Sequence, residues 1–210
     1  MSLSIQELFN SKEIRDLIAK TAVSHRRALH RIPEPAWEES KTTAYIADTL
    51  RALGYAPITG PAVAGHETGV IAELKNGEGR ILALRFDIDA LPKAECASPE
   101  HFPHQAGFAS LHGGRMHACG HDGHAAIGLT LATLLMEEKN RLPKGCIRLI
   151  FQPAEEGCRG ALPLTEKGWL DDVDVFLSGH IVGRDYPGVD TAAAEAEPIR
   201  TVAITLPDAV

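Results

Sequence analysis

HACGHDGH, at residues 117–124, is the stretch that decides how this chain is interpreted. Three histidines, one cysteine and one aspartate lie within these eight residues, with two glycines between them. Thiolate, imidazole and carboxylate groups are the ligands that zinc and related divalent cations prefer in proteins. Taken alone, such a loop also fits a structural zinc site or a locally hydrogen-bonded turn. The surrounding sequence must therefore show which interpretation holds.

The composition is that of an ordinary globular protein. The chain has 210 residues, of which 44% are hydrophobic and 23% charged, enough for one full domain or one domain and part of a second. Its 21 basic and 28 acidic residues give a net charge of −7, which disfavours nucleic acid and anionic membranes as partners. The sequence contains no apolar run of the roughly 20 residues that a membrane helix needs. Without a recognisable signal peptide, the expected location is the cytoplasm, where the four cysteines would be reduced.

Hydrophobic periodicity predicts alternating helices and strands. The expected helices span 11–31, 39–53, 121–139 and 159–167, and the expected strands span 69–74, 80–86, 146–151 and 173–177. The segment NGEG at 76–79 favours a hairpin between the first two strands, and the last two strands are apolar enough to be buried. The alternation predicts an α/β fold, a mixed sheet flanked by helices on both faces.

Coordinating and titratable side chains follow three of these strands directly. One strand leads into Asp87 and Asp89, the next into Glu155 and Glu156, and the last into His180. Ligands of open α/β sheets bind beyond the carboxyl ends of the strands, so these groups are expected to converge beside the 117–124 loop. The paired glutamates suggest a division of labour, in which one binds metal and the other takes a proton from metal-activated water.

Each of these features has a plainer explanation when it stands alone. Glu155-Glu156 is common at a solvated helix start, the Asp87–Asp89 pair is common in turns, and a single His180 is usually a buried structural histidine. Their coincidence at the expected strand ends favours a metal site, with His124 packed beneath the ligands. Two alternatives stay open. One is a metal-binding or regulatory fragment without catalysis, and the other is a thiol enzyme that uses Cys119 with a neighbouring histidine.

Five motifs in order resemble a known family. The segments RRALHRIPEPAWEE, LRFDIDALP, HACGHDGH, IFQPAEEG and SGHI are similar to those of the dinuclear-metal amidohydrolases of the aminoacylase and carboxypeptidase family. The branch indicated contains the hippurate, indole-acetyl-amino-acid and aminobenzoyl-glutamate hydrolases. The resemblance covers residues 24–189. It implies a zinc-peptidase-like α/β/α catalytic domain that cleaves the amide bond of an N-acyl or N-aroyl amino acid.

The resemblance also implies roles for single residues. Cys119 would bridge two divalent ions, and His121, Glu156 and His180 would be further ligands. Glu155 would be the general base, with Asp89 a neighbouring carboxylate beside the site. The expected ions are manganese or zinc. The thiolate favours zinc, whereas the carboxylate tolerates manganese.

Family members continue for about as many residues again, through a lid domain that makes a dimer contact and a returning segment with another ligand. We therefore expect residues 1–190 to be the N-terminal part of the catalytic domain. Residues 191–210, which include the biased segment TAAAEAEP, would be a hinge and the start of the lid domain. The catalytic fold would then be incomplete without the lid and the C-terminal part. The expected partners are a small-molecule N-acyl amino acid and either a second copy or a homologous subunit.

Overall fold

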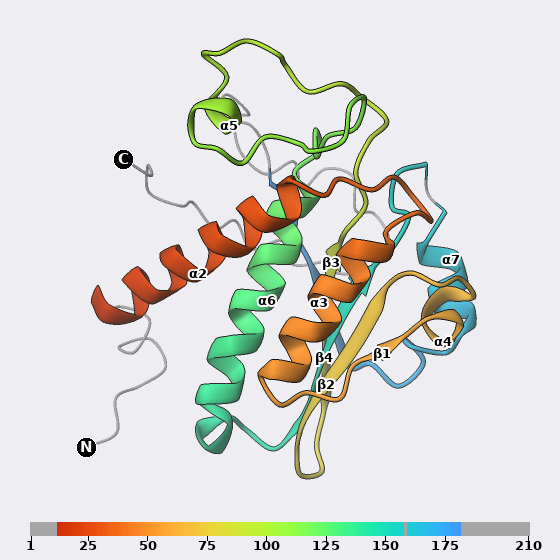
Figure 1. Ribbon diagram of the computed structural model, residues 1–210. Helices are drawn as coiled ribbons and strands as arrows, with labels where there is room; N and C mark the ends of the chain where they lie inside the picture. Colours follow the sequence, from red (N-terminus) through yellow and green to blue (C-terminus); the bar gives the residue numbers. More distant parts are fainter. Residues whose placement is uncertain (1–11, 158, 182–210) are drawn as a thin grey trace, which may run out of the picture.

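The structure is a computed structural model that describes residues 12–157 and 159–181 (Figure 1). The predicted domain boundary at 190 and the hinge at 191–210 lie outside the described residues. The longer elements are α2 (Lys12–His30), α3 (Ser40–Ala52), β2 (Val70–Asn76), β3 (Ile81–Asp87), α6 (His121–Glu137) and β4 (Gly145–Gln152). The short elements are β1 (Ile58–Thr59), α4 (Pro61–Ala64), α5 (Phe102–Gln105), a 3₁₀ turn (Lys139–Arg141), α7 (Ala161–Glu166) and β5 (Val175–Ser178). The predicted helices and strands therefore exist, with small shifts at their ends.

The five strands form one mixed sheet in the order β1-β2-β4-β3-β5. Strands β3, β4 and β5 are parallel, whereas β1 and β2 pair antiparallel. The predicted mixed sheet is confirmed, but the predicted hairpin is wrong, because β4 lies between β2 and β3. Glycines let the 76–79 segment pass close to the start of β4: a Cβ on Gly79 would lie 2.5 Å from the carbonyl oxygen of Lys144. The glycines that favour a hairpin turn in the sequence therefore allow this segment to pass close to the backbone of Lys144.

Alternating residues of the central strands fill two separate cores, one on each face of the sheet. In β2 and β4, Val70, Ala72, Leu149 and Phe151 pack against the α2, α3 and α6 side. Ile71 and Ile150 point the other way, into a smaller core with Val63 of α4 and Leu164 of α7. Figure 1 shows the same arrangement, with α4 and α7 on the side of the sheet opposite to α3 and α6. Helices on both faces are therefore confirmed.

Helix α6 packs especially close to the sheet at Gly128. A Cβ on Gly128 would lie 2.7 Å from ring carbons of both Phe86 and Phe151. The missing side chain therefore lets the helix axis approach the aromatic rings of β3 and β4. This close contact fixes the N-terminal end of α6 over the carboxyl ends of the two parallel strands.

Strand β5 differs from the prediction in its burial. Val175 is 41% exposed, Phe176 46% and Leu177 38%, whereas the apolar sequence predicts a buried strand. The reason is position: β5 is the last strand in the sheet order and pairs with β3 alone within the described residues.

In the part of the chain that the structure describes, no helix is long and apolar enough to cross a membrane.

A long loop between β3 and α6 is tied to the helices by a buried charge network. Glu95 of this loop accepts hydrogen bonds from His30 Nε2 at 3.0 Å and from Ser110 N at 2.6 Å. His30 at the end of α2 donates from its other nitrogen, Nδ1, to Asp122 Oδ2 of α6 at 2.8 Å. Arg26 Nε lies 3.4 Å from the same Asp122 oxygen. Both ring nitrogens of His30 face carboxylates, an arrangement that favours the protonated imidazole.

The charges in this network stabilise one another. Burial alone would lower the pKa of His30, but its hydrogen bonds to Asp122 and Glu95 outweigh burial and raise it. Burial would likewise raise the pKa of both carboxyl groups, yet their bonds to His30 hold the pKa of Glu95 and that of Asp122 below the usual range. A buried ion triad of this kind is costly to break at one member.

Replacing the central cation tests this network. His30→Gln should lower the free energy of unfolding by about 3–5 kcal/mol near pH 6, because two buried carboxylates lose their counter-charge. Because the pKa of His30 is raised in the folded protein, its contribution to the free energy of unfolding is fully present below its pKa in the unfolded chain, about 6.5. That contribution is lost as the pH rises through the pKa of His30 in the folded protein. Urea denaturation at a series of pH values should therefore show the difference from wild type shrinking as the pH rises.

His25 on the same helix is the matched control. Its Nδ1 contacts the Tyr45 hydroxyl at 2.8 Å, and burial lowers its pKa. The decrease in the free energy of unfolding caused by His25→Gln should therefore not shrink as the pH rises. A His30→Gln variant as stable as wild type throughout would contradict the role assigned to the network.

Candidate metal centre

The parallel pairing of β3 with β4 brings the first part of the site together. Asp87 at the end of β3 is in register with Gln152 at the end of β4, so the segments that follow leave the sheet side by side. Asp89 then accepts hydrogen bonds from two consecutive N–H groups: Glu155 N donates to its Oδ1 at 3.0 Å and Glu156 N to its Oδ2 at 2.9 Å. The Asp89 carboxylate therefore holds the backbone of the loop that carries both glutamates.

His121 begins α6 and lies fully buried beside Asp89. Its Nδ1 donates to the Asp89 carbonyl oxygen at 2.9 Å and lies 3.3 Å from the Asp89 carboxylate. Its Nε2 is buried without a hydrogen-bond partner among the described residues. A histidine that binds metal is usually oriented through one ring nitrogen, so that the other is left for the ion.

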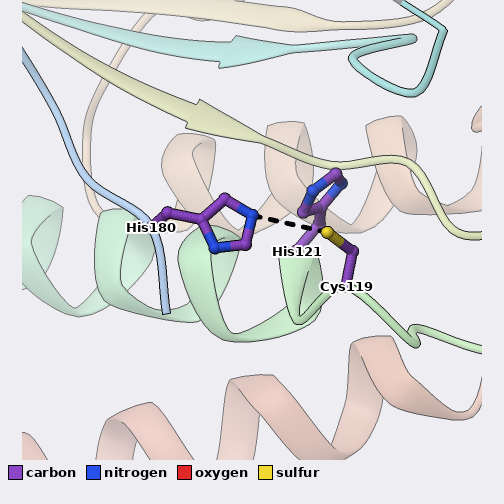
Figure 2. A group of neighbouring side chains, drawn as sticks. All are labelled: Cys119, His121 and His180. Atoms are coloured by element: carbon purple, nitrogen blue, oxygen red, sulfur yellow. Dashed lines mark hydrogen bonds between the residues drawn. The ribbon is translucent and has the colours of Figure 1, made fainter. Parts of the chain in front are cut away.

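Cys119 and His180 complete one side of the site (Figure 2). Gly120, at φ +88°, turns the chain between Cys119 and the first residue of α6, so the cysteine faces the same space as His121. His180, which follows β5, donates from Nδ1 to the Ile181 carbonyl oxygen at 2.7 Å. Its Nε2 lies 3.4 Å from the Cys119 sulfur. In Figure 2 the three side chains point toward one another, with Cys119 and His121 on the segment that begins α6 and His180 on the segment after β5.

The two neighbouring glutamates occupy different surroundings. Oε2 of Glu155 lies 3.7 Å from His121 Nε2, and the Glu155 side chain is 34% exposed. Glu156 Oε1, by contrast, is buried and has no hydrogen-bond partner in the part of the chain described. Ligand atoms of His121, Glu155 and Glu156 all lie within 4.8 Å of one another, as do those of Cys119, His121 and His180.

Asp87 and His124 belong to the same cluster, although sequence reasoning assigned no ligand role to either. His124 Nδ1 makes a short hydrogen bond with Asp87 Oδ1, and His124 Nε2 accepts the Ile181 N–H at 2.8 Å. Arg85 Nη1 lies 2.8 Å from the other Asp87 oxygen. Burial would raise the pKa of Asp87, but its bond to His124 and the nearby charges of His121 and Arg85 lower it.

This arrangement explains what His124 does. Both of its ring nitrogens are used, one by Asp87 and one by the backbone next to His180. His124 therefore links the end of β3 to the segment carrying His180, in agreement with the expectation that it packs beneath the ligands. The sequence signal behind that expectation is the spacing of three residues from His121, which places both on one helical face.

The charges of the site favour a cation. Burial, followed by the carboxylates Glu156, Glu155 and Asp87, raises the pKa of the Cys119 thiol to about 11. Burial lowers the pKa of His121, but its bond to Asp89 and the surrounding negative charges raise it overall. A thiol enzyme needs the opposite shift, because its nucleophile is the thiolate. The thiol-enzyme alternative is therefore disfavoured, whereas a divalent cation would relieve the excess of negative charge.

The residues present fit a metal ion by their unpartnered atoms as well. His121 Nε2 and Glu156 Oε1 are buried polar atoms without a partner among the residues described, and such atoms are costly unless something binds them. All six residues selected from the sequence lie in this cluster: Cys119, His121, Glu156, His180, Glu155 and Asp89. Their geometry agrees with the predicted convergence, and their individual roles stay predictions.

Comparison with known proteins agrees with the geometry. A family model described as Peptidase family M20/M25/M40 matches residues 83–200. A relative from Haemophilus influenzae, named as the homologue of one p-aminobenzoyl-glutamate hydrolase subunit, is 39% identical over 76% of this chain and 46% of its own length. The indole-3-acetyl-aspartic acid hydrolase of Enterobacter agglomerans is 40% identical over 74% of this chain and 44% of its own length.

A solved structure shows the same fold. The YXEP protein of Bacillus subtilis, described as a dinuclear metal binding peptidase from the M20 family, matches with a TM-score of 0.66 and 38% identity. The match covers 79% of this chain and 44% of that one. The chain thus spans less than half the length of each of these relatives. With the matching family model covering more than half of its residues, the chain belongs to Peptidase family M20/M25/M40.

Proposed function

We propose that the protein is a metal-dependent amidohydrolase that cleaves the amide bond between an acyl or aroyl group and an amino acid. The observation that carries this proposal is the convergence of unpartnered ligand atoms from His121 and Glu156 with Cys119 and His180, next to the partly exposed carboxylate of Glu155. The substrate class is suggested by the names of the relatives, which refer to aminobenzoyl-glutamate and to an indole-acetyl amino acid. Hippurate-like compounds share that chemistry.

In this proposal Cys119, His121, Glu156 and His180 would hold two divalent ions. Ions bound there would lower the pKa of a water molecule and polarise the amide carbonyl. Glu155 accepts the proton of the attacking water at its carboxylate and passes it to the leaving nitrogen, so that the C–N bond breaks and an acid and an amine form. The exposure of Glu155 supports this role, because a proton carrier must reach water. Glu156 suits a ligand instead, because its Oε1 atom is buried and has no hydrogen-bond partner among the described residues.

Asp89 positions these groups and takes no proton in the proposed reaction. It holds the N–H groups of both glutamates and orients His121 through its carbonyl oxygen. We propose zinc or manganese as the metal. A small-molecule substrate, a cytoplasmic location and assembly with a second copy or a homologous subunit belong to the same proposal.

A second candidate is a metal-binding unit that does not turn over substrate by itself. The observation that favours it is the cluster of ligand atoms from Cys119, His121 and His180, which fits metal binding whether or not a reaction follows. Metal analysis combined with an amidase assay separates the two candidates. Bound metal without hydrolysis of hippurate-like or aminobenzoyl-glutamate-like substrates would favour the second.

Substituting the proposed general base tests the reaction. Glu155→Gln should lower kcat by about 10²–10⁴-fold while the metal content stays near that of the wild type, because the lost group moves protons and binds no metal. Turnover and metal stoichiometry are measured on the same preparations. Glu166→Gln, which removes an exposed carboxylate on α7, is the control and should leave both unchanged. Loss of metal together with activity would show instead that Glu155 is a ligand.

Removing the thiol tests the metal site. Cys119→Ala should weaken Zn²⁺ binding by more than about tenfold. Substituting a residue that only orients a metal ligand already costs at least about that much affinity, and Cys119 is proposed to bind the metal directly. Mn²⁺ binding should fall less, because the thiolate contributes more to a soft than to a hard cation. Equilibrium dialysis with each metal measures both. The control is Cys146→Ala, a second free thiol that lies in β4 opposite Lys75, at the far end of that strand from Gln152. Equal Zn²⁺ binding by both variants would exclude Cys119 as a ligand.

A further inference from the structure

The loop that carries Glu155 and Glu156 enters the site through a constrained residue. Ala154 has φ +51°, in the left-handed region that residues other than glycine rarely adopt, and it is fully buried. Its carbonyl oxygen accepts hydrogen bonds from Gly160 N at 2.8 Å and Arg159 N at 3.2 Å. Such a conformation persists only when the surrounding structure holds it in place.

Glu39 provides a contact of the required kind. Oε1 of Glu39, at the start of α3, accepts the Ala154 N–H at 2.7 Å, across 115 positions of sequence. Glu39 is 0% exposed, and burial raises the pKa of its carboxyl group. Placing a carboxyl group in such surroundings costs free energy, and a hydrogen bond to a buried N–H offsets part of that cost.

Capping of α3 does not account for the position of the Glu39 side chain. The first N–H groups of that helix are satisfied by Glu34, which accepts from Lys41 N at 3.1 Å and from Thr42 N at 2.9 Å. The Thr42 hydroxyl donates to the same Glu34 carboxylate at 3.0 Å. The Glu39 carboxylate instead reaches out of α3 to the loop after β4.

Close packing around Pro153 leaves the loop little room to shift. A Cβ on Gly69, at the start of β2, would lie 2.7 Å from Pro153 Cδ. A Cβ on Gly160 would lie 1.8 Å from the Pro153 carbonyl oxygen. Gly69 is itself held by α3, because its N–H donates to the Thr43 hydroxyl at 3.0 Å. The loop is therefore seated against the beginning of α3 and the beginning of β2.

Three consecutive N–H groups of this loop thus donate to two buried carboxylates. Ala154 N donates to Glu39, and the N–H groups of Glu155 and Glu156 donate to Asp89. Asp89 fixes the two glutamates, whereas Glu39 fixes the left-handed residue that sets the direction in which the chain enters them. Rotation at Ala154 would swing both glutamate side chains relative to His121 Nε2.

We propose that Glu39 is a positioning residue that acts through the Ala154 N–H to aim Glu155 and Glu156 at the metal site. The inference deepens the proposed function and rests on it. What matters in this arrangement is the reach of the acceptor oxygen, and the charge of the carboxylate is secondary. That distinction separates positioning by a hydrogen bond from a simple electrostatic contribution to cation binding.

Two substitutions separate reach from charge. Glu39→Gln keeps the length and an acceptor oxygen but removes the charge, and Glu39→Asp keeps the charge but draws the acceptor back by one methylene. Glu39→Gln should bind Co²⁺ within about threefold of wild type, with the same absorption spectrum. Glu39→Asp should bind Co²⁺ about 10–100-fold more weakly, the loss typical of contacts that orient metal ligands, and with an altered spectrum. The neighbouring Glu38→Gln is the control, since Glu38 Oε2 pairs with Arg115 Nη2 at 2.8 Å, and both are partly solvent-exposed.

Amide hydrogen exchange of residues 154–157 without metal gives an independent readout. Exchange there should be faster in Glu39→Asp than in wild type, Glu39→Gln and Glu38→Gln. Tighter Co²⁺ binding by Glu39→Asp than by Glu39→Gln, or exchange that is equal in all variants, overturns the positioning role. If the wild type binds Co²⁺ and Glu39→Asp matches it in Co²⁺ binding and in amide exchange, the positioning role of Glu39 is overturned. The proposed function is then unaffected. Wild-type protein that binds no Co²⁺ overturns both.

Discussion

The hydrogen bonds from two successive N–H groups to Asp89 are the constraint on which the site depends. They form because β3 and β4 are parallel and in register at their carboxyl ends, so the segment after one strand runs beside the segment after the other. Asp89 also orients His121, the first residue of α6. One buried carboxylate thereby joins the two loops that carry most of the candidate ligands.

The site concentrates negative charge and compensates it unevenly. Asp87 has Arg85 and His124 beside it, and Asp89 has three N–H groups within hydrogen-bond distance. The protein therefore compensates the negative charge of both carboxylates. Glu155, Glu156 and the Cys119 thiol lack comparable compensation within the described residues, and the pKa of the thiol is raised to about 11 as a result of burial and of these carboxylates. The uncompensated groups lie around His121, whose Nε2 has no hydrogen-bond partner among the described residues. A divalent cation is the simplest species that satisfies all of them.

Sequence reasoning succeeded where local pattern and strand-end geometry determine the outcome. Cys119 and His121 stand at the start of an apolar helix, and the Glu155-Glu156 pair follows an apolar strand. The position of the glutamates beside Asp89 follows from the parallel pairing of β3 and β4. It failed where a third segment intervenes: the 76–79 turn looks like a hairpin because its sequence holds no information that β4 will enter between the strands. Burial of β5 was misjudged for a related reason, since apolar composition does not reveal position in the sheet. The contact between Glu39 and Ala154 joins residues 115 positions apart, and no periodicity signals it.

The segment before β2 supplies none of the candidate ligands, yet it holds both ligand-bearing regions. His30 of α2 donates a hydrogen bond to Asp122, the neighbour of His121. Glu39 at the start of α3 accepts one from the N–H of Ala154, the residue before Glu155. Both contacts are buried, and each uses a titratable side chain where an apolar one would be cheaper to bury. A hydrogen bond fixes direction and distance, which nonspecific apolar packing does not. The N-terminal helices therefore set the angles of the two loops that carry candidate ligands. Substitutions in these helices, far in sequence from the candidate ligands, are expected to change how those ligands are placed.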